Sequence, residues 1–70
     1  MTQAERIMQY MSEFGGITQF EALRDLGVMR LASRISEMRR NGVKINDKMI
    51  SVKNRYGETV HVKRYEVAHE

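Results

Sequence analysis

Hydrophobic positions in the first part of the chain recur at helical spacing and form three stripes. A capping-box pair, Thr2 and Glu5, precedes the first stripe, and a second pair, Thr18 and Glu21, precedes the second. The stripes are Ala4, Ile7, Met8, Met11 and Phe14; then Phe20, Leu23 and Leu26; then Val28, Leu31, Ile35 and Met38. Glycines follow each segment, at 15 and 16, at 27 and at 42. The pattern therefore predicts helices over about residues 3–14, 19–26 and 29–41, with each stripe buried.

After Gly42 the hydrophobic period changes from helical to alternating. Residues 49–53 and 59–63 alternate apolar and polar side chains, which predicts strands over about residues 49–53 and 59–66. A polar five-residue link with one glycine, residues 54–58, joins them. This pattern predicts a β-hairpin with Ile50, Val52, Val60 and Val62 facing inward. Tyr65 and Val67 fall on the other parity, which predicts a bulge or the strand end near Arg64. Residues 43–45 are a candidate for a further short strand, and Ile17 is expected to be only a bridge between helices.

Three helices followed by a two-stranded hairpin are the element order of an α+β winged helix-turn-helix. With 70 residues the chain has room for one small core, and the lack of cysteine excludes a disulfide framework or a thiolate metal site. We expect one domain over residues 1–67 and a short tail over 68–70. Separate substrate and cofactor domains are excluded at this length.

Charge is sorted along the chain, although the overall net charge is only +3. Residues 1–28 have a net charge of −2, because four acidic residues outnumber two arginines. Residues 29–64 contain ten Lys or Arg and three Asp or Glu, a net charge of +7, and the last six residues return −2. A basic segment of this kind favours a polyanionic partner, and the alternative is a charge distribution that serves only solubility.

The basic segment coincides with the helix 29–41 and with the tip of the hairpin; the hairpin is the wing of this fold. Arginines with small hydroxyl side chains on the exposed helix face, Ser36 included, fit major-groove reading, whereas Lys53 to Tyr56 fit a wing on the DNA backbone or in the minor groove. The N-terminus of the helix at Thr18 offers backbone donors to a phosphate. The alternatives are a solvated helix face and a merely soluble turn. The candidate DNA-binding residues are Thr18, Gln19, Met29, Arg30, Ser33, Arg34, Glu37, Arg40, Lys53, Asn54, Arg55 and Tyr56.

Three segments resemble a group of short winged helix-turn-helix proteins of bacteriophages and prophages. They are residues 18–23 running into Leu26-Gly27, residues 30–39 with Gly42 after them, and residues 52–57 of the wing. Met38 stands where leucine is more frequent, which is a volume-conserving change. The resemblance covers nearly the whole chain and implies a small DNA-binding domain of phage type, without a target sequence. It also implies that some of the arginines, such as Arg34 and Arg39, are structural, either capping carbonyls or pairing with Glu13, Glu21 or Asp25.

The sequence contains few residues in the arrangements that catalysis requires. His61 and His69 have no partner at metal-ligand spacing, and there is no cysteine nucleophile, so we expect no enzyme, no metal and no cofactor. The first twenty residues lack the apolar region of a signal peptide and no stretch could span a membrane, which predicts a cytoplasmic protein without a membrane partner. The resemblance implies that the cell is bacterial.

Two functions follow from these observations. The first is binding of double-stranded DNA as a transcriptional regulator or as an architectural or excision-type factor. The second is binding of a host protein, as a phage-encoded inhibitor or adaptor, because a fold does not determine a function. We expect a monomer or a weak homodimer, since only residues 65–70 offer a further surface, by strand pairing.

Overall fold

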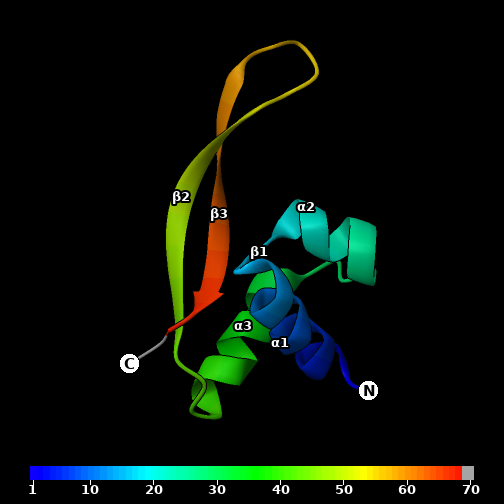
Figure 1. The fold of residues 1–70 in the computed structure, drawn as a ribbon, viewed down its shortest axis with the longest axis vertical. Coiled ribbons are helices and arrows are strands. Elements are labelled where there is room, and N and C mark those ends of the chain that lie inside the picture. The colour runs from blue at the N-terminus through cyan, green and yellow to red at the C-terminus, as the bar shows by residue number, and fades with distance from the viewer. Residues whose placement is uncertain (69–70) are drawn as a thin grey trace.

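The computed structural model describes residues 1–68. Three helical segments lie together, and a long two-stranded hairpin projects away from them (Figure 1). The elements in chain order are α1 (Gln3–Phe14), β1 (Ile17–Thr18), α2 (Gln19–Glu21), the π-helical η1 (Ala22–Leu26), α3 (Leu31–Arg40), β2 (Ile45–Lys53) and β3 (Thr59–Val67). The predicted winged helix-turn-helix architecture is confirmed.

Both predicted capping boxes are present and set the starts of the first two helical segments. The Thr2 hydroxyl accepts a hydrogen bond from the backbone N–H of Glu5 at 3.1 Å, and the Glu5 carboxylate accepts one from the N–H of Thr2 at 3.0 Å. Thr18 and Glu21 repeat this exchange at the start of α2. At the other end of α1, Gly15 adopts a φ of 81°, a left-handed conformation in which glycine carries no Cβ penalty.

Helix α3 is shorter than the predicted 29–41, because the preceding turn is held by a side chain. The Gln19 Nε2 group donates to the carbonyl of Val28 at 3.0 Å, and the Gln19 Oε1 atom accepts from the N–H of Leu31 at 2.9 Å. These two bonds fix the backbone on either side of Met29 and Arg30. Both residues therefore lie in the turn before the helix.

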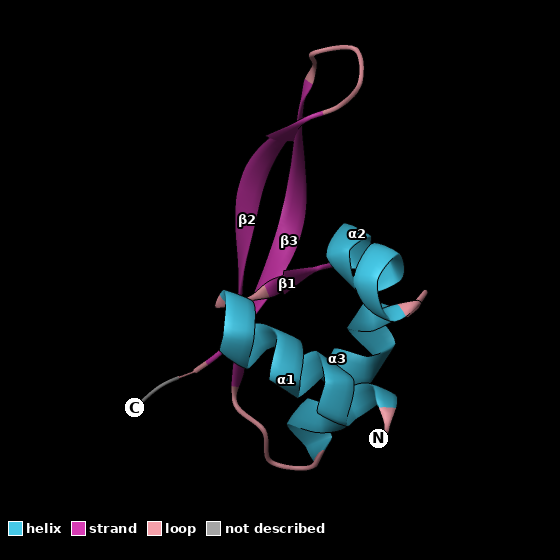
Figure 2. Ribbon diagram, turned by 45° about the vertical axis from the view of Figure 1, so that its right-hand side comes forward, coloured by secondary structure: helices cyan, strands magenta, loops and turns pink. Residues whose placement is uncertain are grey.

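The sheet has three strands in the order β1-β3-β2, all antiparallel (Figure 2). The prediction that Ile17 is only a bridge was wrong, since Ile17 pairs with Tyr65 and Thr18 pairs with Arg64. The chain approaches β3 closely here, and a Cβ atom on Gly16 would lie 2.9 Å from the Tyr65 carbonyl oxygen. Only glycine fits this position without a shift of the backbone.

Strand pairing in the hairpin is continuous, so the predicted bulge or strand end near Arg64 was wrong. The register runs without a break from Ile45 opposite Val67 to Lys53 opposite Thr59. Two-stranded ribbons twist more strongly than larger sheets, and the twist is visible along the hairpin (Figure 1). Because of this twist, apolar side chains can lie on one face of the ribbon at its base and on the opposite face further out, without a bulge between them. Strand β2 begins at Ile45, so of the candidate strand 43–45 only Ile45 is in a strand.

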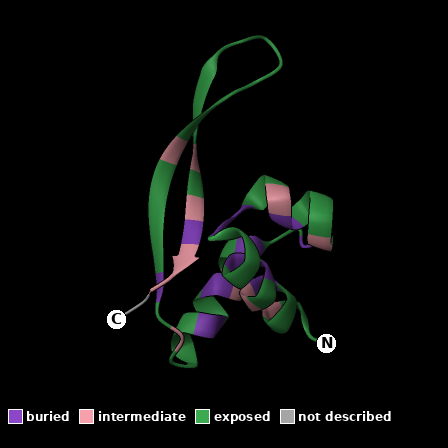
Figure 3. Ribbon diagram, in the orientation of Figure 1, coloured by how far each residue is buried: buried purple, intermediate pink, exposed green. Residues whose placement is uncertain are grey.

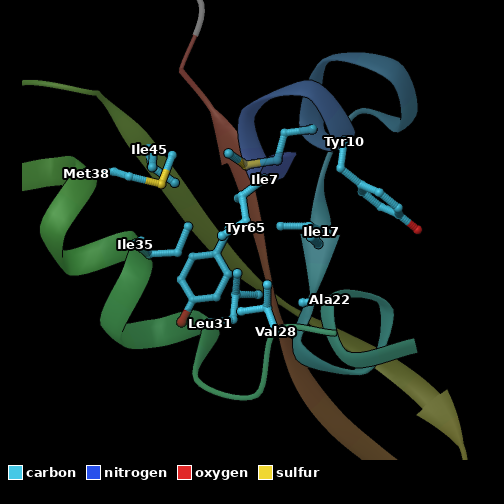
Figure 4. Packing of buried hydrophobic residues seen from close by; sticks show 11 residues of the cluster. Ile7, Tyr10, Ile17, Ala22, Val28, Leu31, Ile35, Met38, Ile45 and Tyr65 are labelled. Atoms are coloured by element: carbon cyan, nitrogen blue, oxygen red, sulfur yellow. The ribbon is translucent and has the colours of Figure 1, made fainter. Parts of the chain in front are cut away.

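The core lies between the helices and the base of the sheet (Figures 3 and 4). The prediction of burial was wrong for three residues: Phe14, Phe20 and Leu23 are 58%, 67% and 49% exposed. The second helical segment, which is α2 followed by η1, packs inward through the small residue Ala22 instead. The buried cluster consists of Ile7, Tyr10, Met11, Ile17, Ala22, Val28, Leu31, Ile35, Met38, Ile45 and Tyr65.

The inward face predicted for the hairpin is only partly covered. Val52 and Val60 are each 37% exposed, and Ile50 and Val62 are half-buried. The core includes Tyr65 at the base of β3, whose ring lies beside Leu31 and Ile35 of α3 (Figure 4).

Candidate nucleic-acid interface

The polar side chains of helix α3 lie outside its buried apolar stripe, and they differ in the contacts that they make. Leu31, Ile35 and Met38 are buried. Arg34 reaches towards α1, where its Nε donates to the Gln3 side-chain oxygen at 2.8 Å, and its Nη1 pairs with Glu37 at 3.0 Å. Arg34 and Glu37 are therefore engaged on the α1 side of the helix.

Arg39 holds the base of the hairpin. Its Nη2 donates to the carbonyl of Ile45 at 2.8 Å and lies 3.4 Å from an oxygen of Asp47, while the guanidinium carbon lies 6.0 Å from the centre of the Tyr65 ring. The implied carbonyl-capping role is present. The acidic partner is Asp47, and not Glu13, Glu21 or Asp25.

Asp25 instead connects the first two helical segments. Its carboxylate accepts from Arg24 at 2.7 Å and 2.9 Å and from the Tyr10 hydroxyl at 2.5 Å. The hydrogen bonds from Arg24 and then Tyr10 lower the pKa of Asp25 to about 2, and the bond to Asp25 raises the pKa of Tyr10. This polar link fixes α1 against η1 outside the apolar core.

Few basic side chains remain without a partner. Within residues 1–68 the guanidinium groups that make no hydrogen bond, ion pair or ring contact are those of Arg6, Arg30, Arg40 and Arg55. Arg30 is the residue directly before α3 and makes no side-chain capping bond, Arg40 is the last residue of α3, and Arg55 lies in the tip of the wing. Three of these four arginines thus lie at the two ends of α3 and in the wing, the elements that the sequence singles out.

The neighbours of Arg30 and Arg40 differ in how far they are exposed. Met29 is 77% exposed, Ser33 is half-buried and Ser36 is exposed. Ser36 and Arg40 are four residues apart, so they lie one above the other on the same helix face. The set of unpaired side chains on this helix face is smaller than the sequence predicts, because Arg34 and Glu37 are bonded to each other and Arg34 is bonded to Gln3.

The wing tip is held by one side chain. The Asn54 Oδ1 atom accepts from the backbone N–H of Tyr56 at 2.9 Å and of Glu58 at 3.0 Å, and the Asn54 Nδ2 group donates to the Glu58 carboxylate at 3.2 Å. Lys53 donates to the Thr59 hydroxyl across the ladder at 2.8 Å. Tyr56 is 79% exposed beside Arg55. Asn54 therefore positions the tip, and Arg55 and Tyr56 are presented to solvent.

Thr18 and Gln19 have local structural roles. The Thr18 side chain is buried and occupied by its capping box, which also places the Glu21 carboxylate at the start of α2. Gln19 uses both ends of its amide to clamp the turn before α3. Sequence reasoning missed this clamp, and no spacing rule signals it, because the two backbone partners come from a later turn.

Neither a metal-ligand cluster nor a membrane-spanning helix is found in the described part of the chain. Residues 1–68 contain no group of three or more His, Cys, Asp or Glu side chains that could hold a metal ion. None of the helices described for those residues is long and apolar enough to cross a membrane. His69 and the end of the predicted tail lie outside the described residues.

Comparison with known proteins agrees with this geometry. Residues 2–70 match the family described as winged helix-turn-helix domain. The chain belongs to this family. Winged helix-turn-helix domains are typically DNA-binding and not enzymatic. No curated protein and no solved structure matches the chain.

Proposed function

We propose that this winged helix binds double-stranded DNA with α3 in the major groove and the wing on the flanking backbone or minor groove. The observation that carries the proposal is the placement of the unpaired guanidinium groups of Arg30, Arg40 and Arg55. An arginine that is already paired must give up its partner before it binds a base or a phosphate. An unpaired one gives up only water, so these three side chains are the most available.

The remaining candidate residues fall into two groups by their contacts. Met29, Ser33 and Tyr56 are neighbours of the three arginines in the sequence or on the helix and are assigned to the contact surface. Lys53, whose side chain donates, within residues 1–68, only to the neutral Thr59 hydroxyl, is assigned to it as well. Five others hold hydrogen bonds within the protein and are assigned to positioning that surface: Thr18, Gln19, Arg34, Glu37 and Asn54.

The biological role that fits this surface is that of a small regulator, or an architectural or excision-type factor, of a phage or prophage in the bacterial cytoplasm. We assign one domain to residues 1–67. We also propose that it acts as a monomer, as a weak homodimer or as several copies side by side on DNA. Pairing of a second copy along residues 65–70 is limited by the fold, since Tyr65 already has β1 on one side and β2 on the other.

A competition experiment tests the proposed surface. After selection of a preferred duplex from random sequences, the affinities for that duplex and for single-base variants are compared by fluorescence anisotropy. Arg30→Gln and Arg40→Gln should each reduce the discrimination between duplexes by about 1–3 kcal/mol for every bidentate bond to a base that is removed. Arg6→Gln removes an equally unpaired arginine from α1 and should leave the discrimination unchanged. Equal effects of all three substitutions, or no duplex binding at all, would refute the assignment.

A second candidate function, binding to a protein of the host, is favoured by an apolar groove beside the wing. A first test of this second function is whether a protein partner is recovered from host lysate after nuclease treatment. Recovery of DNA alone would count against it.

A further inference from the structure

A groove lies between the second helical segment and the hairpin, and it is walled by apolar side chains. Its volume is about 870 Å³, within the range of about 300–1,000 Å³ that is usual for ligand sites. Phe20 forms part of one wall. The other wall consists of two cross-strand pairs, Ile50 with Val62 and Val52 with Val60.

These apolar side chains are only partly covered by the part of the chain that the structure describes: Ile50 and Val62 are half-buried, and the Arg24 guanidinium carbon lies 5.2 Å from the centre of the Phe20 ring. Phe20 is 67% exposed, and Val52 and Val60 are each 37% exposed. The hairpin stands away from the helices along this stretch, and its outer part is exposed in Figure 3. Clustered exposed apolar surface on a small domain is typical of an interaction site.

The charges that line the groove are mostly positive. Arg24, Lys53, Lys63 and Arg64 line it together with one acid, Glu21. Two of these cations have weak partners: Lys53 donates to a neutral hydroxyl, and Lys63 is 3.9 Å from Asp47. A segment that buries apolar side chains here would therefore be stabilised by acidic residues at its ends. We infer that the groove docks a partner protein through an apolar segment with acidic flanks.

A second copy of this chain fits the groove less well, because its own acids are already engaged. Within residues 1–68 every carboxylate except that of Glu13 accepts a hydrogen bond or an ion pair. DNA is also a poorer occupant of the inner walls, because they are apolar and the three arginines assigned to DNA contact lie at the ends of α3 and on the wing tip. Of the residues assigned to the proposed DNA contact surface, Lys53 also lines the groove, and three of the positioning residues, Thr18, Gln19 and Asn54, line it as well.

This inference names the surface for the second candidate function and does not depend on DNA binding. The test is selection of a randomised twelve-residue peptide library, displayed on yeast, against the immobilised full chain. We expect the binders to be enriched in apolar residues together with Asp and Glu. Absence of enrichment, or enrichment without acidic residues, would overturn the inference.

Matched variants locate the binding site of the selected peptides. Phe20→Ala should weaken them about tenfold, as removal of an aromatic anchor does at an interface. Leu23→Ala removes another exposed apolar side chain from the same helical segment, but Leu23 does not line the groove, so its effect should stay within about twofold. Equal effects of the two substitutions would contradict the assignment.

The charge requirement has its own pair of variants. Lys63→Gln should weaken the acidic peptides about threefold, whereas Lys48→Gln, outside the groove and paired with Glu66, should not. Sedimentation of the chain alone completes the test, since a dimer that Phe20→Ala abolishes would show that a second copy fills the groove. Duplex binding by Phe20→Ala is measured in parallel, so that failure of this inference is distinguished from failure of the proposed DNA binding.

Discussion

Arg39 and Arg40 are neighbours in the sequence, yet their guanidinium groups have opposite surroundings. Arg39 donates to the Ile45 carbonyl and stands over Tyr65, whereas Arg40 has no partner in the described part of the chain. A count of basic residues does not separate these two roles. The hydrogen bonds do, and they assign Arg39 to the fold and Arg40 to the surface.

This difference predicts that the same substitution has a larger effect on stability at Arg39 than at Arg40. Arg39→Met leaves the Ile45 carbonyl without its donor and should lower the free energy of unfolding by about 1 kcal/mol, since the site is partly exposed. Arg40→Met should change it by less than about 0.5 kcal/mol. Urea unfolding of both variants measures this, and equal stabilities would contradict the structural role of Arg39.

The lowered pKa of Asp25 makes the free energy of unfolding depend on pH. Its pKa is about 2 in the folded chain, against an ordinary value of 3.8, because Arg24 and Tyr10 donate to the carboxylate. Its contribution is therefore complete above about pH 4 and is lost as the pH falls through 2. Asp25→Asn should give a flatter stability profile between pH 4 and pH 2 than the natural sequence.

Glu13 supplies the control for this effect, because it has no hydrogen-bonded or ion-paired partner among residues 1–68. Glu13→Gln should reproduce the natural profile. Thermal unfolding followed by circular dichroism across the pH range compares all three proteins. A profile for Asp25→Asn that is as steep as that of the natural sequence would show that the link from Tyr10 to Asp25 is not formed.

At the scale of elements, strand β1 depends on a close approach that only Gly16 allows. A Cβ atom there would meet the Arg64 guanidinium at 2.8 Å and the Tyr65 carbonyl at 2.9 Å. Gly16→Ala should therefore push β1 away from β3 and cost about 1–3 kcal/mol. Ser12→Ala, at an exposed position of α1, is the control. Unchanged unfolding of Gly16→Ala would mean that β1 does not pack as described.

The helices could be predicted from the sequence because their signals are local. Both capping boxes and the buried stripe of α3 involve residues three or four apart, and the structure confirms them. Strand β1 could not, since its two residues gain their structure from Tyr65 and Arg64 far along the chain. Phe20 was predicted to be buried because spacing defines a face, but spacing does not show whether another element covers that face.

The candidate site was predictable to the same extent. The sequence places Arg30, Arg40 and Arg55 on the recognition helix and the wing, and the structure leaves all three unpaired. Spacing alone could not show that Gln19 and Asn54 hold turns or that Arg34 bonds to Gln3, because those bonds depend on the rotamer and on the tertiary neighbours.

At the scale of the whole molecule, the winged helix separates two kinds of surface. Three of the four arginines that are unpaired within residues 1–68 lie at the ends of α3 and in the tip of the hairpin, in a molecule whose longest dimension is 39 Å. The apolar groove lies between the hairpin and the second helical segment. One small domain therefore offers a cationic surface suited to DNA and a separate surface suited to a protein.

The salt dependence of duplex binding tests the central claim most directly. The dissociation constant for a mixed-sequence duplex, measured across a series of salt concentrations, should rise steeply, with a log–log slope of about 0.9 for each phosphate neutralised. Arg55→Gln should lower that slope by about one, whereas Arg6→Gln should leave it unchanged. No binding at low salt, or the same decrease in slope from Arg6→Gln as from Arg55→Gln, would contradict the proposal that α3 and the wing bind DNA.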